Sequence, residues 1–346
     1  MTNGLPPTGI EKILVRLPNW IGDAVMSTPA LGAVRAFFPQ AEITVAAPPA
    51  VAELFRSHPY CDRIVVLGQG SAFPGLARWW AAAQALRRQR FDLAILFQNA
   101  ISAAFLATLA RCRRRIGYVT DGRGFLLTHR APTPDRGRRL HQVHYYLEML
   151  KHFGIGDGKP ILKLECTAEE REWARNRLGQ GQWIAINPGA AYGEAKRWFP
   201  ERFAQVADGL AREFGCGILL TGGPGEIRIG SDIEAAMESR PLNLIGQTTV
   251  RQLMALLSQS SLMITNDSGP MHIAAAFGVP LVAIFGPTDH LTTSPWTDRA
   301  EIIREDFPCA PCLKRKCPID HRCMKAVSAE KVLEKSRLLL AAPAGN

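Results

Sequence analysis

The residues of this chain that are best suited to chemistry lie in loops after apolar runs, and the first of them is Asp23. It belongs to the stretch ILVRLPNWIGDAVMSTPAL, in which an apolar run leads through a loop into a helix-like pattern. A carboxylate at a helix start can cap the helix by accepting hydrogen bonds from free backbone N–H groups. The same carboxylate, held at the edge of a cleft, can remove a proton as a general base. Asp23 alone supports both interpretations.

A second loop carries two adjacent cations, Lys196 and Arg197, in the run NPGAAYGEAKRWFP. The loop follows the apolar run WIAI and precedes a helix that is expected to begin near Pro200. A cation placed in this way can contact a diphosphate and stabilise the negative charge that builds up as the diphosphate departs. The alternative interpretation is a solvated pair of charges on the surface.

A third loop, TGGPGE, follows the apolar run GILL and ends with Glu226. Its glycines and proline predict a tight turn. A carboxylate after a strand of a Rossmann-type sheet often binds ribose hydroxyls. The competing interpretation is a helix-terminal carboxylate that the helix dipole favours.

A fourth loop links the apolar run LMIT to the helix-like run GPMHIAAAFG. Asp267 or Ser268 can cap this helix, Gly269 permits the turn, and Pro270 suits the first helical turn. The free N–H groups and partial positive charge at such a helix start suit an anion such as a diphosphate, although an ordinary capped helix has the same sequence pattern. His272 is either a packed side chain or a further donor to that phosphate.

Four cysteines occur within fifteen residues near the end of the chain, in the run CAPCLKRKCPIDHRC. They are Cys309, Cys312, Cys317 and Cys323, with His321 nearby. Four thiols can form a structural zinc site. The spacing is tighter than that of the usual paired zinc ribbon, so a reduced basic loop and a disulfide remain as alternatives.

Apolar runs alternate with helix-like segments along the whole chain. KILVRLP, AEITVAAP, RIVVLG and FDLAILF are typical of buried strands, because they are short, rich in apolar residues and bounded by turn residues. WIAINPG, GILLTGG, NLIGQ, LMITNDSG and PLVAIFGP repeat the pattern in the second half. This alternation predicts an α/β fold with parallel sheets covered by helices.

The glycine-rich loop at 154–160 predicts a boundary between two Rossmann-like domains. We predict a first domain over 1–160 and a second over 161–326, which ends with the cysteine-rich segment 309–323. A final helix is expected within 327–346, packed back on the first domain. In open parallel sheets, ligands bind at the carboxyl ends of the strands. All four loops with chemical side chains are predicted to lie there.

The 346 residues include 41 Lys and Arg against 31 Asp and Glu, a net charge of +10. This excess favours anionic partners, although each Arg-rich run, at 111–115 and 136–139, can equally be a solvated face. The sequence has no zinc-finger, helix-turn-helix or RNP pattern, so nucleic acid is not an expected partner. It also lacks GxGxxG and GxxxxGK[ST], which disfavours a dehydrogenase or a P-loop NTPase.

The sequence also bears on location. It has no apolar run near the ~20 residues that span a bilayer. The first residues, MTNGLPPTGIEK, lack the pattern of a secretory signal. We therefore expect a cytoplasmic protein with reduced cysteines.

Together, these motifs resemble those of glycosyltransferase family 9, the ADP-heptose:lipopolysaccharide heptosyltransferases. LPNWIGDAVMSTPAL, RIGY, NPGAAYGEAKRWFPERF, TGGPGE and NDSGPMHIAAAFG occur in the order of that family, and the resemblance runs from about Ile13 to Leu333. PNWIGDAVMS and YGEAKRWFP are most similar to its heptosyltransferase II branch. Ala191 and Tyr192 replace hydroxyl residues that the heptosyltransferase I branch carries.

The resemblance implies a GT-B fold, in which an acceptor-binding and a donor-binding domain, both Rossmann-like, face a central cleft. It implies an inverting transfer of heptose from ADP-L-glycero-D-manno-heptose to the lipopolysaccharide inner core, as the second heptose. Asp23 matches the general base, and Lys196 matches a lysine at the donor diphosphate. The expected donor-binding residues are Arg197, Glu226 (ribose), Thr248 (near the adenine), Asp267, Ser268, Gly269, Pro270 and His272.

The implied acceptor is lipid A–Kdo–heptose at the inner face of the inner membrane, where we expect the protein to be peripheral and monomeric. The expected acceptor-binding residues are Asn19, Arg113, Arg114, Arg115 and Arg123. No cofactor is expected for catalysis, because a lysine and a helix terminus can neutralise the diphosphate. The alternatives are heptosyltransferase I or III on another core acceptor, a nucleotide-dependent oxidoreductase or epimerase, and a non-catalytic sugar- or lipid-binding protein.

Overall fold

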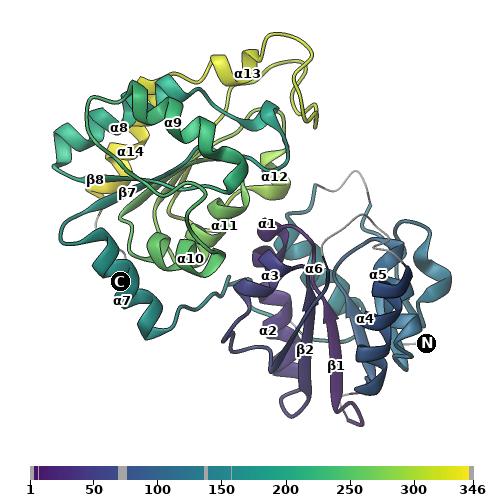
Figure 1. Cartoon of the computed structure of the whole chain (residues 1–346). Helices are drawn as coiled ribbons and strands as arrows, with labels where there is room; N and C mark the ends of the chain where they lie inside the picture. Colours follow the sequence, from purple (N-terminus) through teal and green to yellow (C-terminus); the bar gives the residue numbers. More distant parts are fainter. Residues whose placement is uncertain (1–3, 7, 69–75, 136–138, 157, 343–346) are drawn as a thin grey trace. The chain divides into compact units, whose positions relative to one another are not determined.

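The computed structural model describes residues 4–6, 8–68, 76–135, 139–156 and 158–342 (Figure 1). The chain divides into two compact units, Met1–Glu165 and Cys166–Asn346. The division falls a few residues beyond the boundary predicted at 160/161. Each unit contains a six-stranded sheet in which every neighbouring pair of strands is parallel. The predicted α/β class with two Rossmann-like halves is therefore confirmed.

The strands of the first unit are β1 (Lys12–Arg16), β2 (Glu42–Ala47), β3 (Arg63–Val66), β4 (Leu93–Leu96), β5 (Arg114–Tyr118) and β6 (His129–Ala131). Its helices are α1 (Ile21–Met26), α2 (Thr28–Phe37), α3 (Pro49–Leu54), α4 (Leu76–Arg88), α5 (Ile101–Leu109), the 3₁₀ helix η1 (Arg123–Leu126) and α6 (Gln142–His152). Strand β4 is buried along its whole length, as expected for a parallel strand covered by helices on both faces. One helical layer contains α1, α2 and α6, and the other contains α4 and α5.

The strands of the second unit are β7 (Trp183–Asn187), β8 (Gly217–Leu220), β9 (Leu242–Asn243), β10 (Leu262–Asn266), β11 (Leu281–Ile284) and β12 (Ala300–Ile303). Its helices are α7 (Ala168–Leu178), η2 (Glu194–Lys196), α8 (Pro200–Phe214), η3 (Pro224–Glu226), α9 (Ile227–Ala236), α10 (Val250–Ser258), α11 (Gly269–Ala276), α12 (His290–Thr293), α13 (Arg322–Lys325) and α14 (Ala329–Ala341). Helices α8, α9 and α14 form one layer, and α7, α10 and α11 form the other.

The order of the strands identifies where ligands should bind in each unit. The first sheet has the order β3-β2-β1-β4-β5-β6, and the second has the order β12-β11-β10-β7-β8-β9. The chain reverses direction across the sheet between β1 and β4 in the first unit, and between β7 and β10 in the second. Doubly wound sheets bind ligands outside the carboxyl ends of the strands at such a switch point. The loops after β1, β7 and β10 therefore hold the candidate sites.

The final helix differs from its predicted place. We expected 327–346 to pack back on the first domain, but α14 contacts α8 and strands β10, β11 and β12 of the second unit. Val327, Ala329 and Val332 are buried in the second core together with Phe203 of α8. The apolar face of α14 is thereby covered within its own unit. Among the described residues, no helix is both long and apolar enough to cross a membrane.

A buried carboxylate, Asp208, joins α8 to the chain that follows α9. It accepts hydrogen bonds from the backbone N–H groups of Glu238 (2.8 Å) and Ser239 (2.9 Å) and from the Ser239 hydroxyl (2.6 Å). Burial alone would raise the pKa of Asp208, but these hydrogen bonds outweigh it, so the pKa lies below its ordinary value of 3.8.

We expect Asp208→Asn to destabilise the protein by about 1–3 kcal/mol near neutral pH, because the hydrogen bonds to the charged carboxylate weaken. A lowered folded-state pKa stabilises the fold above the unfolded pKa, and that contribution is lost as the pH falls through the folded pKa. The difference in unfolding free energy between wild type and variant should shrink from pH 6 toward pH 3, as measured by urea titration. A difference that stays constant over this range would contradict the prediction.

Candidate active site

Asp23 lies beyond the carboxyl end of β1, at the switch point of the first sheet. It is the third residue of α1, whose N-cap residue is Trp20. Burial, and then the nearby Asp23 carboxylate, raise the pKa of Tyr146 of α6 well above its ordinary value. Asp23 is partly exposed, so its carboxylate is near a buried phenol and still within reach of solvent. A first-turn carboxylate also interacts favourably with the helix dipole, so the base role stays a prediction.

A buried arginine that the sequence analysis missed supports the same loop. Arg16, at the end of β1, is 8% exposed and donates to Asn19 Oδ1 (2.6 Å), to the carbonyl of Ala46 (3.3 Å) and to that of Leu17. Burial lowers the pKa of Arg16 to about 10, so it is fully charged at neutral pH. Arg16 thus fixes the side chain of Asn19, which lies in the loop between β1 and α1. The only sequence signal for Arg16 was a charge within an otherwise apolar strand.

Three of the four arginines expected to bind the acceptor lie away from this edge. Arg113, Arg114 and Arg115 lie at the amino end of β5, whereas Asn19 and Asp23 follow the carboxyl end of β1. All strands between them are parallel, so the two groups lie at opposite edges of the sheet. Arg115 donates to the backbone carbonyls of Leu126 and Cys112, both at 2.7 Å. These hydrogen bonds within the first unit account for the position of its side chain.

Arg123 has a structural position and is not available to an acceptor. Its side chain is fully buried and donates to the carbonyls of Tyr118 (2.9 Å), Leu96 (3.4 Å) and Gln98 and to Asn99 Oδ1 (3.3 Å). These bonds join the ends of β4 and β5 to the η1 turn. The acceptor role expected for Arg123 is therefore not supported by its placement. No local pattern in the sequence indicated that the side chain of Arg123, five residues after Tyr118, would be buried against the ends of these strands.

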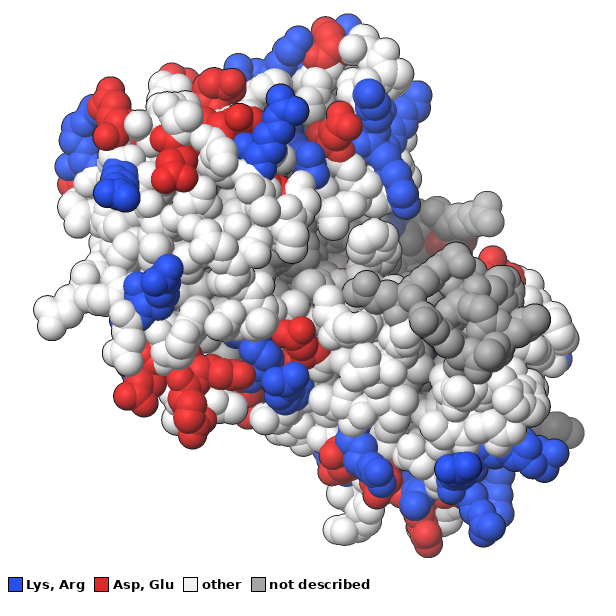
Figure 2. Space-filling view, in the orientation of Figure 1, with Lys and Arg blue, Asp and Glu red and all other residues white. Residues whose placement is uncertain are grey.

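Basic side chains predominate at one end of the visible side of the first unit. Figure 2 shows Lys and Arg gathered at its lower end, with a few Asp and Glu among them. Of the two Arg-rich runs, 111–115 includes the exposed Arg113, which pairs with Asp92 at 3.5 Å. Residues 136–138 of the other run lie outside the described residues. The charge at the lower end of this face is therefore mixed, with an excess of cations.

Lys196 is the central cation at the switch point of the second sheet. It follows β7 on the short η2 helix, and its Nζ donates to Asp267 Oδ2 at 2.6 Å, after β10. The side chains of this pair are only 12% and 6% exposed. The hydroxyl of Thr288, after β11, donates to the same Asp267 oxygen at 2.6 Å. The loops after three adjacent strands therefore meet at one carboxylate.

Asparagine side chains fix the backbone around this pair. Asn266 Nδ2 donates to the carbonyl of Pro188 (2.7 Å), and its Oδ1 accepts from the N–H of Trp198 (3.1 Å). Ser268 Oγ contacts Thr265 Oγ1 (3.0 Å) and Asn187 Oδ1 (3.2 Å). The loops after β7 and β10 are thus held together on both sides of Lys196. Thr288 and these asparagines were missed as site residues, although each lies at the carboxyl end of a strand.

The start of α11 has the features that its sequence predicted. Ser268 is the N-cap residue, Gly269 begins the helix, and Pro270 occupies its first turn. Ser268 uses its hydroxyl toward Thr265 and Asn187 and makes no side-chain cap bond within the helix. The Ser268 side chain therefore leaves the first-turn N–H groups of α11 uncapped, and this helix start lies at the switch point of the sheet. His272 is 2% exposed, so it is a packed side chain beneath this helix start.

Arg197 also has a feature expected of a donor-binding residue. It follows Lys196 in extended conformation. Its Nε atom is buried and has no hydrogen-bond partner among the described residues. A buried guanidinium N–H that lacks a partner costs free energy unless a ligand satisfies it. The atom suits a phosphate or hydroxyl oxygen.

Glu226 turns back toward the loop that follows β7. Its carboxylate accepts from the N–H of Gly223 at 2.8 Å and lies directly against Gly189, where any Cβ would collide with it. Gly246, in the loop before Thr248, packs on Ile227 beside it. Glu226 and the segment of Thr248 therefore lie close to the β7 loop, at the same edge of the sheet as Lys196. The glycines at 189 and 246 are the unrecognised signals of this approach.

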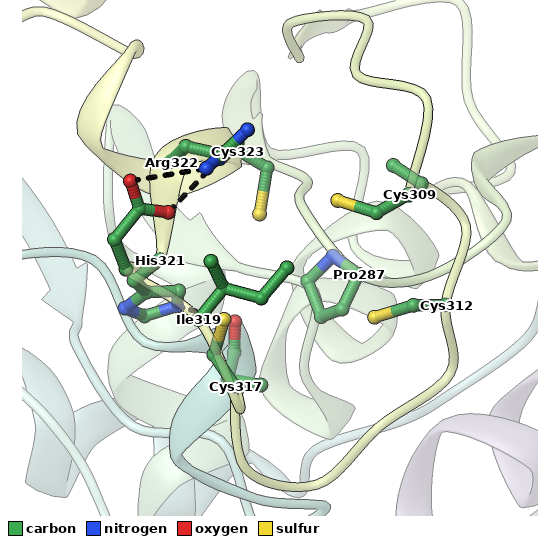
Figure 3. Close-up of a pocket in the computed structure, with 11 residues that line it drawn as sticks. Pro287, Cys309, Cys312, Cys317, Ile319, His321, Arg322 and Cys323 are labelled. Atoms are coloured by element: carbon green, nitrogen blue, oxygen red, sulfur yellow. Dashed lines mark hydrogen bonds and ion pairs between the residues drawn. The ribbon is translucent and has the colours of Figure 1, made fainter.

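The four late cysteines line a single small pocket in the second unit (Figure 3). All four are free thiols. As they are placed, no three side chains of His, Cys, Asp or Glu within the described part of the chain surround a common metal position. The segment that carries them contacts the loop of Lys196 through the hydrogen bonds Tyr192–Leu313 and Ala195–Arg315.

A model of glycosyltransferase family 9 (heptosyltransferase) matches residues 79–322 of this chain. The chain is 31% identical over 338 residues to lipooligosaccharide heptosyltransferase 2 of Campylobacter jejuni, which covers 95% of this chain and 98% of that protein. It is 30% identical over 307 residues to lipopolysaccharide heptosyltransferase 2 of Escherichia coli, with 85% and 88% covered.

Solved structures agree with these sequence matches. The structure of E. coli ADP-heptose lps heptosyltransferase II is 26% identical, with a TM-score of 0.82, and covers 95% of this chain and 98% of that chain. A family 9 glycosyltransferase from Veillonella parvula, 24% identical with a TM-score of 0.86, shares the fold over 98% and 99% of the two chains. The chain belongs to glycosyltransferase family 9 and is a GT-B glycosyltransferase, as the resemblance predicted.

We expect Lys196 and Asp267 to be strongly coupled in stability. A double-mutant cycle with Lys196→Met and Asp267→Asn should give a coupling energy of about 1–3 kcal/mol in urea unfolding, because the pair is buried. The matched control is the exposed pair Arg212–Glu238, whose side chains are 73% and 79% exposed and whose coupling should be at most about 1 kcal/mol. Equal coupling in the two cycles would show that Lys196 is not held by Asp267.

Proposed function

We propose that this chain transfers heptose from ADP-L-glycero-D-manno-heptose to the lipopolysaccharide inner core and adds the second heptose. The observation that carries this proposal is the cation Lys196, paired with the buried Asp267 at the second switch point of a family 9 chain. The relatives named heptosyltransferase 2, which match most of the chain, support the heptose and the core acceptor. The proposed position of the transferred sugar, as the second heptose of the core, is taken from the names of the same relatives.

The donor is proposed to bind along the carboxyl edge of the second sheet. Lys196, Arg197 and the N–H groups at the start of α11 suit the diphosphate. Glu226 suits the ribose hydroxyls, and the segment of Thr248 suits the adenine. Asp267 acts on the donor through Lys196, because it fixes the ammonium group at the place where the diphosphate charge develops.

We propose a single displacement with inversion. The acceptor hydroxyl attacks the anomeric carbon of the heptose from the face opposite the diphosphate, and its proton passes to the Asp23 carboxylate. The bond between the anomeric carbon and the phosphate oxygen breaks, and ADP leaves with the electron pair. Lys196 and the α11 start stabilise the added negative charge. Under this proposal the reaction uses no metal ion, since these groups already neutralise the leaving diphosphate.

Two other functions are alternatives. The first changes the acceptor of the transfer, and the second changes the class of protein from enzyme to binding protein. Heptosyltransferase I or III activity would keep the same donor site with another core acceptor. A non-catalytic sugar- or lipid-binding protein would need none of the buried pairing around Lys196. The joint presence of Asp23, Lys196 and Glu226 at carboxyl edges favours an enzyme.

The decisive assay is ADP release with ADP-heptose and mono-heptosylated, truncated lipopolysaccharide. We expect Asp23→Asn to lower kcat by ~10²-fold or more, because a general base contributes about 10²–10⁴-fold, while ADP affinity in calorimetry stays unchanged. The control is Glu11→Gln, an exposed carboxylate at the amino edge of the same sheet, which should keep full activity.

The outcomes separate the components of this proposal. Activity only on a core acceptor that lacks heptose would support the proposed donor and refute the proposed acceptor. No ADP release from either acceptor would refute the proposed donor. Full activity of Asp23→Asn would assign Asp23 to the helix terminus and place the base elsewhere.

We also propose that the protein works in the cytoplasm as a monomer, peripheral to the inner face of the inner membrane, where its lipid-anchored acceptor resides. The exposed Arg113 and neighbouring Arg114 would contact anionic lipid, where each cation contributes about 1 kcal/mol. Arg113→Ala with Arg114→Ala should weaken co-sedimentation with anionic vesicles by roughly 30-fold and leave kcat on a delipidated acceptor unchanged. Arg212→Ala, an exposed arginine of the second unit, is the control. Unchanged vesicle binding of the double variant would rule out this surface.

A further inference from the structure

The cysteine-rich segment 309–323 has no regular secondary structure over most of its length. Residues 304–321, between β12 and α13, form neither helix nor strand. Leu313 and Ile319 are 57% and 59% exposed, so apolar burial contributes little to this part of the chain. Loops of this length without secondary structure are uncommon in compact domains and usually have a function.

The four thiols of the segment line one small pocket. Figure 3 shows Cys309, Cys312, Cys317 and Cys323 around it, together with Pro287 and Ile319. The cavity is about 20 Å³, which suits a single ion or water and excludes an organic ligand. Cys323 is buried, Cys312 and Cys317 are half-buried, and Cys309 is exposed.

Asp320 and His321 line this pocket together with the four thiols. The imidazole Nε2 of His321 lies 2.7 Å from the carbonyl oxygen of Ala195, and the Asp320 carboxylate accepts from Arg322 Nε at 3.0 Å, so both groups already have partners and the four thiols are the preferred ligands. Four thiolates select thiophilic ions of the zinc and iron class. A divalent ion with four thiolates has a net charge of −2, and Lys314, Arg315, Lys316 and Arg322 of the same segment offset it.

We propose that Cys309, Cys312, Cys317 and Cys323 bind one thiophilic divalent ion, with Zn²⁺ as the preferred ion, in a structural site. Each thiol loses its proton on binding, so the protein releases four protons for each ion bound. Coordination requires closure of the segment, since no three donors in the described residues share a metal position as placed. The buried Cys323 is the fixed ligand, and the three more accessible cysteines move toward it.

The fixed ligand is anchored at the edge of the second sheet. Gly286, just after β11, has Cys323 Sγ 3.1 Å from the position of a Cβ, and Met324 packs on the same glycine. Thr288, two residues later, donates to Asp267. One end of the segment is thereby joined to the loop that completes the Lys196–Asp267 pair.

The middle of the segment is bonded to the loop that carries Lys196. The hydroxyl of Tyr192 donates to the carbonyl of Leu313 (2.7 Å), and the N–H of Ala195 donates to the carbonyl of Arg315 (3.0 Å). The centroid of the Tyr192 ring lies 4.9 Å from the Lys196 ammonium nitrogen and 5.4 Å from the central carbon of the Arg315 guanidinium. Gly193 has no Cβ, and the backbone of Arg315 occupies the space that one would fill.

These contacts give the metal site a second role, which rests on the proposed function. An ion that closes the segment also fixes Leu313 and Arg315, and through them the backbone on both sides of Lys196. The four cysteines are thus positioning residues for the donor-binding lysine. A misplacement of about 1 Å in such a group can lower activity by roughly 10²-fold.

The first test measures metal and does not depend on activity. Protein purified without chelators should contain about one equivalent of zinc or iron per chain by elemental analysis, and a mercurial thiol reagent should release it. The double variant Cys309→Ser, Cys312→Ser should lose the ion. Cys61→Ser, a half-buried thiol of the first unit, should retain it. Wild-type protein without metal after growth in zinc and iron, or a double variant that keeps the ion, would overturn the proposal.

The second test measures the loop. Chelation, or the double variant, should increase amide hydrogen exchange over 192–197 and leave exchange in β1 unchanged. In the same protein, kcat/KM for ADP-heptose should fall roughly 10–100-fold. Metal loss without faster exchange over 192–197 would refute the coupling to Lys196. If the transferase assay fails altogether, the metal and exchange results still decide the site by themselves.

Discussion

Parallel pairing is the constraint on which the rest of this structure depends. A parallel strand can be joined to its neighbour only by a long crossover, so each unit needs helices on both faces of its sheet. The same pairing brings the carboxyl ends of all six strands to one edge. Where the strand order reverses, two adjacent loops diverge and leave room for a ligand. Asp23 follows the first strand at one switch point, and Lys196 and Asp267 follow the two central strands at the other.

The ion pair at the second switch point offsets the desolvation cost of placing the Lys196 ammonium group there. A buried ammonium group without a partner is strongly disfavoured by desolvation. Asp267 supplies the opposite charge, and Thr288 gives the same carboxylate oxygen a further donor. The lysine is therefore in place before any anion binds, and little side-chain entropy remains to be lost. The arrangement also explains why an acidic residue stands at a helix start that is suited to phosphate.

The sequence was sufficient to predict the elements and which loops follow the carboxyl ends of the strands, and insufficient to predict the placement of individual long side chains. Strands, helices and their alternation are local patterns, and the loops at their carboxyl ends follow from topology. Arg123 illustrates the limit. Its charge suggested a surface role, but its hydrogen bonds to four groups around β4 and β5 depend on distances that no local pattern contains. Helix α14 shows the same limit, because an amphipathic helix does not specify which unit covers its apolar face.

Glycines occupy the positions where distant parts of the chain approach the site loops of the second unit closely. Gly189 gives its space to the Glu226 carboxylate, Gly193 to the backbone of Arg315, and Gly286 to Met324. Each lies in a loop after a strand of the second sheet, and each admits a neighbour from a distant part of the chain. At these three positions a side chain would separate the loops that form the site. The small residues therefore determine the geometry of the site as much as the charged ones, because they set how closely the loops pack around Lys196.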